Sequence, residues 1–135
     1  MAAEQPTVFH YKLIANRWSP VISVGIRFGQ TWRPFQLFLD SGATYSILHH
    51  DVAADLAFEY QKGRRMLVQM GDGRMIPVFV HELPVQIARV RITAPVGFSS
   101  GLGVPFDLLG RLGIFEHYRI CFHEKRRVVS FQPVG

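Results

Sequence analysis

One carboxylate stands at the end of a run of apolar residues, where a tight turn begins. The run extends from Phe35 to Leu39 and leads directly into Asp40, Ser41 and Gly42. Apolar runs bounded by turn residues are typical of buried strands. A carboxylate at the end of such a strand is costly to desolvate unless the site compensates it, which singles out Asp40. Gly42 lets the backbone turn sharply, and Ser41 supplies a hydroxyl that both donates and accepts hydrogen bonds.

The turn and the run before it resemble the catalytic loop of aspartic proteases, most closely that of the single-domain retropepsin-like family. The resemblance rests on Asp40, Ser41, Gly42 and Ala43, preceded by Leu37, Phe38 and Leu39. In that family each subunit of a dimer gives one Asp, and the two carboxyls share a proton across the dimer axis. The resemblance implies that Asp40 is catalytic and that the next three residues form the active-site loop.

A second motif near the C-terminus also resembles that family. It consists of Leu108, Leu109, Gly110 and Arg111. In the family such an apolar pair lies under the catalytic loop, and the glycine lets the chain pass close behind it. These residues are therefore expected to support Asp40. Many members carry an acid two residues after the catalytic glycine, which pairs with the Arg. Here Thr44 holds that position, so Arg111 needs another partner, either Asp107 or an acid of a second subunit.

A glycine-tipped hairpin is expected over residues 64–80, between the two motifs. Apolar residues alternate on both sides of the tip: Met66, Val68 and Met70 before it, and Ile76, Val78 and Val80 after it. Pro77 indicates that the second strand lies at a sheet edge. The resemblance implies that the hairpin is a flap over the substrate. Its substrate-binding residues would be Met70, Gly71, Asp72 and Gly73.

The other elements are expected to be mostly strands. In the first half they are a strand over Val8–Ile14, a hairpin of Val21–Phe28 and Trp32–Leu39, and a short strand over Tyr45–Leu48. A helix is expected over His50–Phe58, with Val52, Ala53, Leu56 and Ala57 on one face. In the second half they are a strand over Leu83–Ala94 with a bulge or turn at Ala88-Arg89, a flexible loop at 99–103, a helical turn or two at Ile114–Tyr118, and a closing hairpin of Arg119–Phe122 and Val128–Gln132. With the resemblance, this predicts a mainly β, closed β-barrel-like acid-protease (retropepsin) fold with one or two short helices.

The length of 135 residues suits one domain, and an apolar content of 48% supports a packed core. We expect a disordered tail at residues 1–7 and a single domain at 8–135. Cys121 is the only cysteine, which excludes an intrachain disulfide; on the closing strand it is expected to be structural rather than nucleophilic. The N-terminus does not resemble a signal peptide, and no apolar run approaches the roughly 20 residues of a membrane span. A cytoplasmic location without a membrane segment is therefore expected.

The sequence holds a single Asp-Ser-Gly, whereas a two-lobed enzyme of the pepsin type carries two copies. The resemblance therefore implies a homodimer that acts on a peptide or protein substrate. Each subunit would give its Asp40, and the reaction needs no cofactor.

Three other functions are weighed against this one. The first is a non-catalytic domain of the same fold that mediates dimerisation or peptide binding. The second is a metal site, for which candidate ligands are His49, His50, Asp51, Asp55, His81, Glu82, His117 and His123. No His-x-x-x-His spacing occurs, so no metal is expected. The third is nucleic-acid binding, suggested by a net charge of +5. The aromatic residues fall within apolar alternation and no RNA-binding signature occurs, so no nucleic-acid partner is expected.

Overall fold

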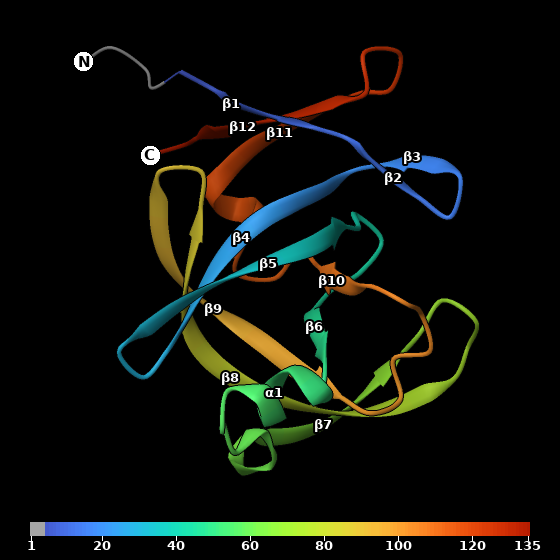
Figure 1. Ribbon diagram of the computed structural model, residues 1–135, viewed down its shortest axis with the longest axis vertical. Helices are drawn as coiled ribbons and strands as arrows, with labels where there is room; N and C mark the ends of the chain where they lie inside the picture. Colours follow the sequence, from blue (N-terminus) through green and yellow to red (C-terminus); the bar gives the residue numbers. More distant parts are fainter. Residues whose placement is uncertain (1–4) are drawn as a thin grey trace.

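A seven-stranded sheet dominates the computed structural model, which describes residues 5–135 (Figure 1). Its strands, in spatial order, are β4 (Val21–Phe28), β5 (Thr31–Leu39), β10 (Asp107–Leu109), β6 (Ser46–His49), β9 (Val90–Ser99), β8 (Met75–Ile87) and β7 (Arg64–Gln69). β4 also pairs with β8, through Gly25 opposite Gln86 and Ile26 opposite Val85. All strands of this sheet except β7 therefore close into a ring. The prediction of a mainly β fold is confirmed.

Two smaller sheets and three short helices complete the described chain. One sheet has the order β1-β12-β11, with β1 at Thr7–His10, β12 at Val128–Pro133 and β11 at Tyr118–His123. The other pairs β2 (Lys12–Ile14) with β3 (Arg17–Ser19). The helices are α1 (Asp51–Asp55) and the 3₁₀ helices η1 (Tyr60–Lys62) and η2 (Phe115–His117). Of the expected N-terminal tail, residues 1–4 lie outside the described residues, and Thr7 already pairs with Phe131.

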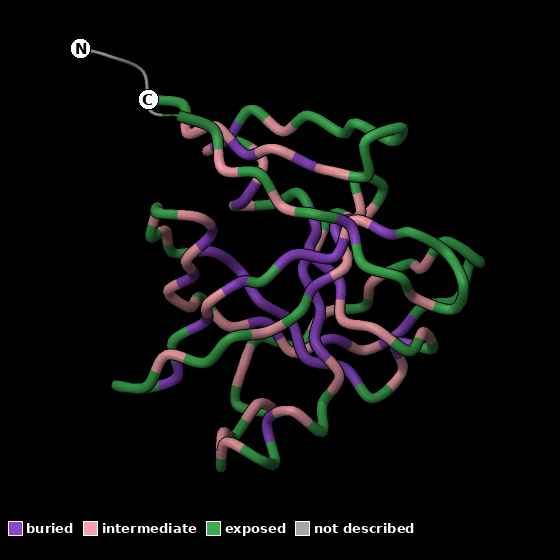
Figure 2. The backbone as a smooth tube through the Cα atoms, turned by 45° about the horizontal axis from the view of Figure 1, so that its top comes forward, coloured by how far each residue is buried: buried purple, intermediate pink, exposed green. Residues whose placement is uncertain are grey.

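The core divides into two clusters of buried side chains. The backbone stretches that carry buried residues gather at the centre of the molecule (purple in Figure 2). The larger cluster fills the closed sheet and includes Phe98 and Leu109. It forms because residues of period two point inward: Ile22, Val24 and Ile26 of β4 are all buried. The smaller cluster lies between β6, β10 and the β7–β8 hairpin.

The strand predicted over Val8–Ile14 is broken in the structure. Tyr11 is buried and stands between β1 and β2, where its backbone N–H donates to the Arg127 carbonyl and its hydroxyl donates to Glu124. The hydroxyl contact and the burial raise the pKa of Tyr11 to about 12, burial being the larger cause. The chain changes sheets at this residue. The prediction of one continuous strand was wrong because apolar alternation says nothing about which neighbour each half pairs with.

The second half of the hairpin is longer than predicted. Instead of separate strands ending at Val80 and beginning at Leu83, β8 runs without interruption for 13 residues. Its first half pairs with β7 and its second half with β9, and Ala88, at φ 57°, begins the turn into β9. At Pro77 the register shows pairing with β7, while pairing with β9 begins only at Phe79. The prediction that this whole strand lies at a sheet edge was wrong, because β8 stands between β9 and β7. Only the stretch around Pro77 is unpaired on one side, which accommodates its missing N–H.

The helix predicted over His50–Phe58 covers only Asp51–Asp55. Ala57 adopts a positive φ of 51° and is exposed, so it does not extend the apolar face of the helix. Ala53 is fully buried. Asp51 lies in the first turn, where a negative charge interacts favourably with the helix dipole. Within residues 5–135, no helix has both the length and the apolar character that a membrane crossing requires.

Candidate active site

Asp40 directly follows β5 and is held by its own turn. Its backbone N–H donates to the Leu109 carbonyl at 3.0 Å, and its carbonyl accepts the N–H of Ala43 at 3.1 Å. Its carboxylate oxygen Oδ1 accepts the N–H of Gly42 at 2.9 Å. The carboxylate is half-buried and its direction is set by the loop that follows it. A Cβ at Gly42 would lie 3.2 Å from that oxygen, so the turn has little space for a side chain there.

The segment from Leu109 to Leu112 is hydrogen-bonded along the back of this loop. Arg111 N–H donates to the Ala43 carbonyl at 3.0 Å, and Leu112 N–H donates to the Thr44 carbonyl at 2.8 Å. The backbone of the second motif thus runs alongside that of the Asp40 loop. These bonds, together with the one from Asp40 to Leu109, hold the two motifs as one unit.

Gly110 explains why this close approach needs a glycine. A Cβ at this position would lie 2.4 Å from the carbonyl oxygen of Tyr45 and 3.0 Å from that of Ala43. Its N–H donates to Ser46 Oγ at 3.0 Å, inside the protein. The sequence-based reason for a glycine here, close passage behind the loop, therefore agrees with the geometry.

The two leucines of the motif point into different clusters. Leu109 packs in the larger core, and Leu108 packs in the smaller cluster with Ile76 and Val78 of β8. β10 pairs in parallel with β5, Leu109 standing opposite Leu39. The apolar pair therefore joins the Asp40 loop to the central core on one side and to the hairpin on the other.

A pocket of about 300 Å³ lies between the Asp40 loop and the hairpin tip. The residues lining it come from both: Asp40, Gly42, Ala43, Thr44, Tyr45, Ile47, Val68, Gln69, Met70, Gly71 and Leu108. The structure thus brings together the expected catalytic residue, two residues of its loop and the first half of the expected flap tip. Ser41 is exposed outside the pocket, and Asp72 and Gly73 are not among its lining residues.

The hairpin tip is closed by hydrogen bonds within it. Met70 N–H donates to the Arg74 carbonyl at 2.8 Å, and Gly73, at φ 89°, donates to the Met70 carbonyl at 2.9 Å. The Asp72 carboxylate accepts the Arg74 backbone N–H at 3.0 Å and the Arg74 Nε at 2.7 Å. Hydrogen bonds from the Arg74 side chain and backbone hold the pKa of Asp72 below its usual value. Asp72 is exposed and serves the tip's own turn.

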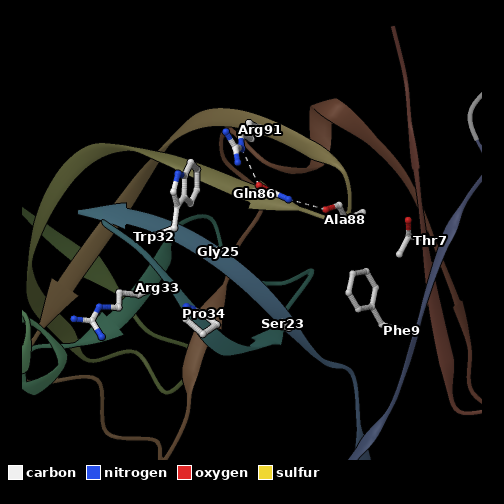
Figure 3. Close-up of a pocket in the computed structure, with 10 residues that line it drawn as sticks. All are labelled: Thr7, Phe9, Ser23, Gly25, Trp32, Arg33, Pro34, Gln86, Ala88 and Arg91. Carbon is white, nitrogen blue, oxygen red and sulfur yellow. Dashed lines mark hydrogen bonds between the residues drawn. The ribbon is translucent and has the colours of Figure 1, made fainter. Parts of the chain in front are cut away.

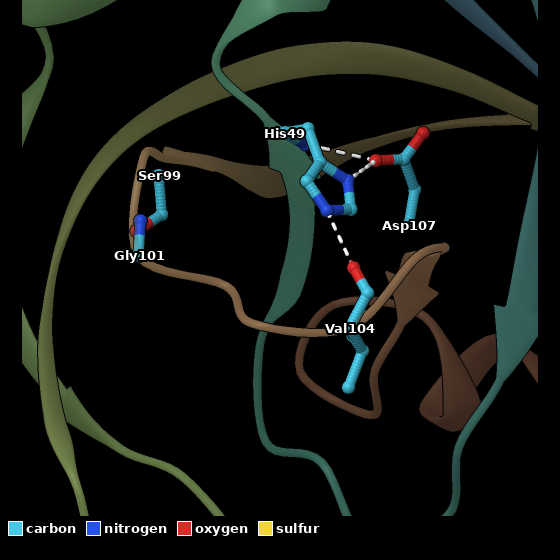
Figure 4. A network of polar contacts seen from close by, with 5 residues as sticks. All are labelled: His49, Ser99, Gly101, Val104 and Asp107. Carbon is cyan, nitrogen blue, oxygen red and sulfur yellow. Dashed lines mark hydrogen bonds and ion pairs between the residues drawn. The ribbon is translucent and has the colours of Figure 1, made fainter.

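A polar network that sequence reasoning missed lies beside β10 (Figure 4). Asp107 Oδ1 accepts both the backbone N–H and the Nδ1 of His49, each at 2.8 Å. The other ring nitrogen of His49, Nε2, lies 2.6 Å from the Val104 carbonyl. Because 58 residues separate His49 from Asp107, no local pattern in the sequence signals the pair.

Of the two partners considered for Arg111, the structure excludes Asp107. Asp107 is bonded to His49, so it is not the acid that pairs with Arg111. Arg111 is exposed, and within residues 5–135 it forms no ion pair. The other alternative, an acid of a second subunit, stays a prediction.

The residues considered for a metal are dispersed over the described chain. No three His, Cys, Asp or Glu side chains of residues 5–135 gather in a way that would hold an ion. His49 is bonded as described, and His81 Nε2 lies 2.7 Å from the Tyr60 carbonyl. Cys121 is exposed on β11.

The comparisons with known proteins agree with this geometry. The sequence profile of a family described as aspartyl protease matches residues 24–109, which is more than half of the chain. The chain belongs to the aspartyl protease family. No curated protein matches this aspartyl protease. Its matched region contains the Asp40 loop, the hairpin and the first two residues of the second motif.

Solved structures show the fold of this aspartyl protease. It is similar to the crystal structure of a retropepsin-like aspartic protease from Rickettsia conorii, with a TM-score of 0.64 and 14% identity, covering 94% of this chain and 98% of that one. It is also similar to the EIAV protease in complex with the inhibitor HBY-793, with a TM-score of 0.50 and 22% identity over 73% of this chain and 86% of that one. The predicted retropepsin fold is confirmed.

Proposed function

We propose that the protein is an aspartic endopeptidase whose active site forms in a homodimer, with Asp40 of each subunit as one half of the catalytic pair. The observation that carries this proposal is the position of the Asp40 carboxylate. It lies in the pocket under the hairpin tip, with its direction set by the Gly42 N–H. The proposal also rests on the family match.

Hydrolysis by this route uses two carboxyl groups side by side. Two carboxylates about 3 Å apart cannot both be charged at low cost, so the pair holds one proton. The charged member takes a proton from the attacking water, and the neutral member donates a hydrogen bond to the scissile carbonyl. When the bond breaks, a proton passes to the leaving amine and the pair returns to its starting state.

A second copy of the chain supplies the missing carboxyl in this proposal. Asp40 is the only acidic side chain that lines the pocket in the described chain. Next to the Asp40 loop, Ser41, Thr44, Arg111 and Leu112 are exposed, and Leu112 leaves 44% of its surface open. An apolar side chain on this surface suits a contact about a two-fold axis, which would also bring Ser41 and Arg111 toward the partner.

The hairpin acts as the flap in this proposal. An extended peptide in the pocket lies between the Asp40 loop and residues 70–73, where its backbone pairs with the flap as an added strand does. The apolar lining from Ile47, Val68 and Leu108 receives its side chains. Closing of the flap excludes bulk water from the reacting atoms.

The test of catalysis is the variant Asp40→Asn, assayed against a peptide library at mildly acidic and neutral pH. It should lose peptidase activity and keep the unfolding transition of the wild type. The matched control is Asp55→Asn, which removes an exposed carboxylate from α1 and should leave activity unchanged. Turnover that survives Asp40→Asn would refute the assignment. A wild-type dimer that cleaves no library peptide would favour the non-catalytic binding domain instead.

The test of the shared site is a dilution series. Specific activity should fall as monomers form, with the sedimentation coefficient falling over the same concentrations. Leu112→Asp should shift both transitions to higher protein concentration, because it places a charge on the proposed contact. A monomer with full specific activity at every concentration contradicts the dimeric site.

A further inference from the structure

A second concave surface lies away from Asp40, at the other end of β5 (Figure 3). It is a groove of about 480 Å³ between β1, β4, β5 and the β8–β9 turn, lined by Thr7, Phe9, Ser23, Gly25, Trp32, Arg33, Pro34, Gln86, Ala88 and Arg91. β5 has nine residues, which corresponds to roughly 30 Å of extended chain. The groove and the Asp40 pocket share no lining residue.

The Arg91 side chain is held in position at the rim of this groove. Its guanidinium lies 4.8 Å from the centre of the Trp32 ring. Its Nε donates to Gln86 Oε1 at 2.8 Å, and Gln86 Nε2 in turn donates to the Ala88 carbonyl at 3.3 Å. These contacts fix the plane of the guanidinium, and Arg91 is exposed. A fixed guanidinium binds a carboxylate with less loss of side-chain entropy than a free one.

No carboxylate within residues 5–135 neutralises this surface. Arg27, opposite Trp32 in the β4–β5 register, lies 6.0 Å from the same indole ring, and no Asp or Glu is among the lining residues. The Arg33 side chain alternates with that of Trp32 and points away from this face (Figure 3). None of these arginines takes part in an ion pair within the described chain. Two copies that met through this groove would bring arginines against arginines, which disfavours a second copy as its occupant. The surface is complementary to a ligand that brings several negative charges.

The shape of the groove favours an extended peptide over a nucleic acid. Its floor passes Gly25, where a Cβ would stand 3.5 Å from the Trp32 ring, so the indole lies directly on the backbone of β4. Because the Arg91 guanidinium lies over the ring and the Gly25 backbone approaches it closely, the ring has little free face on which a base would stack. Phe9 and Pro34 supply apolar walls beside this charged rim. We propose that the groove binds an acidic, extended segment of a partner protein, whose carboxylates pair with Arg91 and Arg27.

The test is the binding of a fluorescein-labelled peptide of about eight residues, with Glu alternating with Val, measured by anisotropy at low salt. The double variant Arg27→Gln/Arg91→Gln should weaken binding by about tenfold or more, the loss of two charge-assisted contacts. The matched control is Lys125→Gln/Arg126→Gln, which removes the same charge from exposed residues that line neither the groove nor the Asp40 pocket. It should bind within about twofold of the wild type. Equal losses in both double variants would overturn the proposal, because binding would then follow net charge alone.

A second measurement locates the peptide without altering the groove. The chain has two tryptophans, so in the Trp18→Phe background all indole emission comes from Trp32. Its emission should shift on peptide addition with the same midpoint as the anisotropy, and an unchanged emission during binding contradicts the site. A single-stranded RNA hexamer that displaces the peptide at lower concentration would assign the groove to nucleic acid instead. Asp40→Asn should bind the peptide as the wild type does, so this result does not depend on whether the proposed peptidase activity is found.

Discussion

The Asp107 carboxylate accepts two hydrogen bonds from His49, one from the backbone N–H and one from ring Nδ1, each 2.8 Å long (Figure 4). β10 is only three residues long and its register with β6 consists of Leu108 opposite Ile47. The double contact anchors the first residue of this short strand. Because Leu109 of the same strand accepts the N–H of Asp40, the pair helps to hold the candidate catalytic loop.

The other side of the His49 ring makes this contact sensitive to protonation. Nε2 faces the Val104 carbonyl at 2.6 Å, so both ring nitrogens face acceptors. Only the protonated imidazole donates to both at once. Burial alone lowers the pKa of His49, but the hydrogen bonds to Asp107 and Val104 and the charges of Asp107 and Asp51 outweigh it and raise the pKa above 6.5.

We therefore expect the free energy of unfolding to depend on pH through His49. A pKa that is raised on folding contributes stability that is complete below the unfolded value near 6.5 and is lost as pH rises through the folded value. The loss should be on the order of 1 kcal/mol, because the pair is partly exposed. Urea unfolding over this pH range measures it. His49→Gln should remove this part of the pH dependence, whereas His123→Gln, an exposed histidine on β11, should retain it. An identical pH dependence in wild type and His49→Gln would contradict this role.

Gly110→Ala should destabilise the protein by more than about 2 kcal/mol, because the new methyl group would overlap backbone atoms of Tyr45 that cannot move aside. Chemical denaturation measures the loss. Gly71→Ala is the matched control, since a Cβ there meets nothing within 4 Å, and it should change stability by less than about 0.5 kcal/mol. If the two variants unfold at the same denaturant concentration, the backbone approach behind the Asp40 loop is not as close as described.

Gly42→Ala tests the aim of the Asp40 carboxylate. The added Cβ would stand 3.2 Å from Oδ1, so the carboxylate has to shift by a few tenths of an ångström. We expect kcat for peptide cleavage to fall by about tenfold, since small displacements of a reacting group slow catalysis strongly. Stability should change little, and Gly135→Ala, which adds a methyl group in open space, should have wild-type kcat. Wild-type kcat in Gly42→Ala would show that the carboxylate direction is not set by this turn.

Leu102→Ala should destabilise the protein by about 2–4 kcal/mol, because the side chain is 1% exposed and packs with Ile76 and Val78 of the hairpin. Thermal or urea unfolding measures the change. Leu67 serves as the control: it is 56% exposed on the same hairpin, and Leu67→Ala should stay within about 0.5 kcal/mol of the wild type. A small effect at Leu102 would mean that residues 100–106 do not support the base of the hairpin.

The local parts of the site were predictable from the sequence, because their signals lie within a few neighbouring residues. The turn at Asp40, the glycine behind it and the hairpin between residues 64 and 80 each depend on backbone requirements of short segments. The partner of Asp107 was not predictable, because it depends on strands β6 and β10 meeting across 58 residues. The same limit explains the break at Tyr11 and the uninterrupted β8, where the choice of neighbouring strand, and not the apolar pattern, decides the outcome.

The pairing of β4 with β8 also decides where the protein is able to give way. Because these strands form a closed sheet, none of them can move outward without breaking backbone hydrogen bonds to both neighbouring strands. β7 and the front part of β8 project beyond that ring, and within the described chain they are paired mainly with each other. Lifting the hairpin to admit a peptide would therefore bend this projection against its packing on Leu102 and Leu108, while the ring that carries Asp40 keeps its shape.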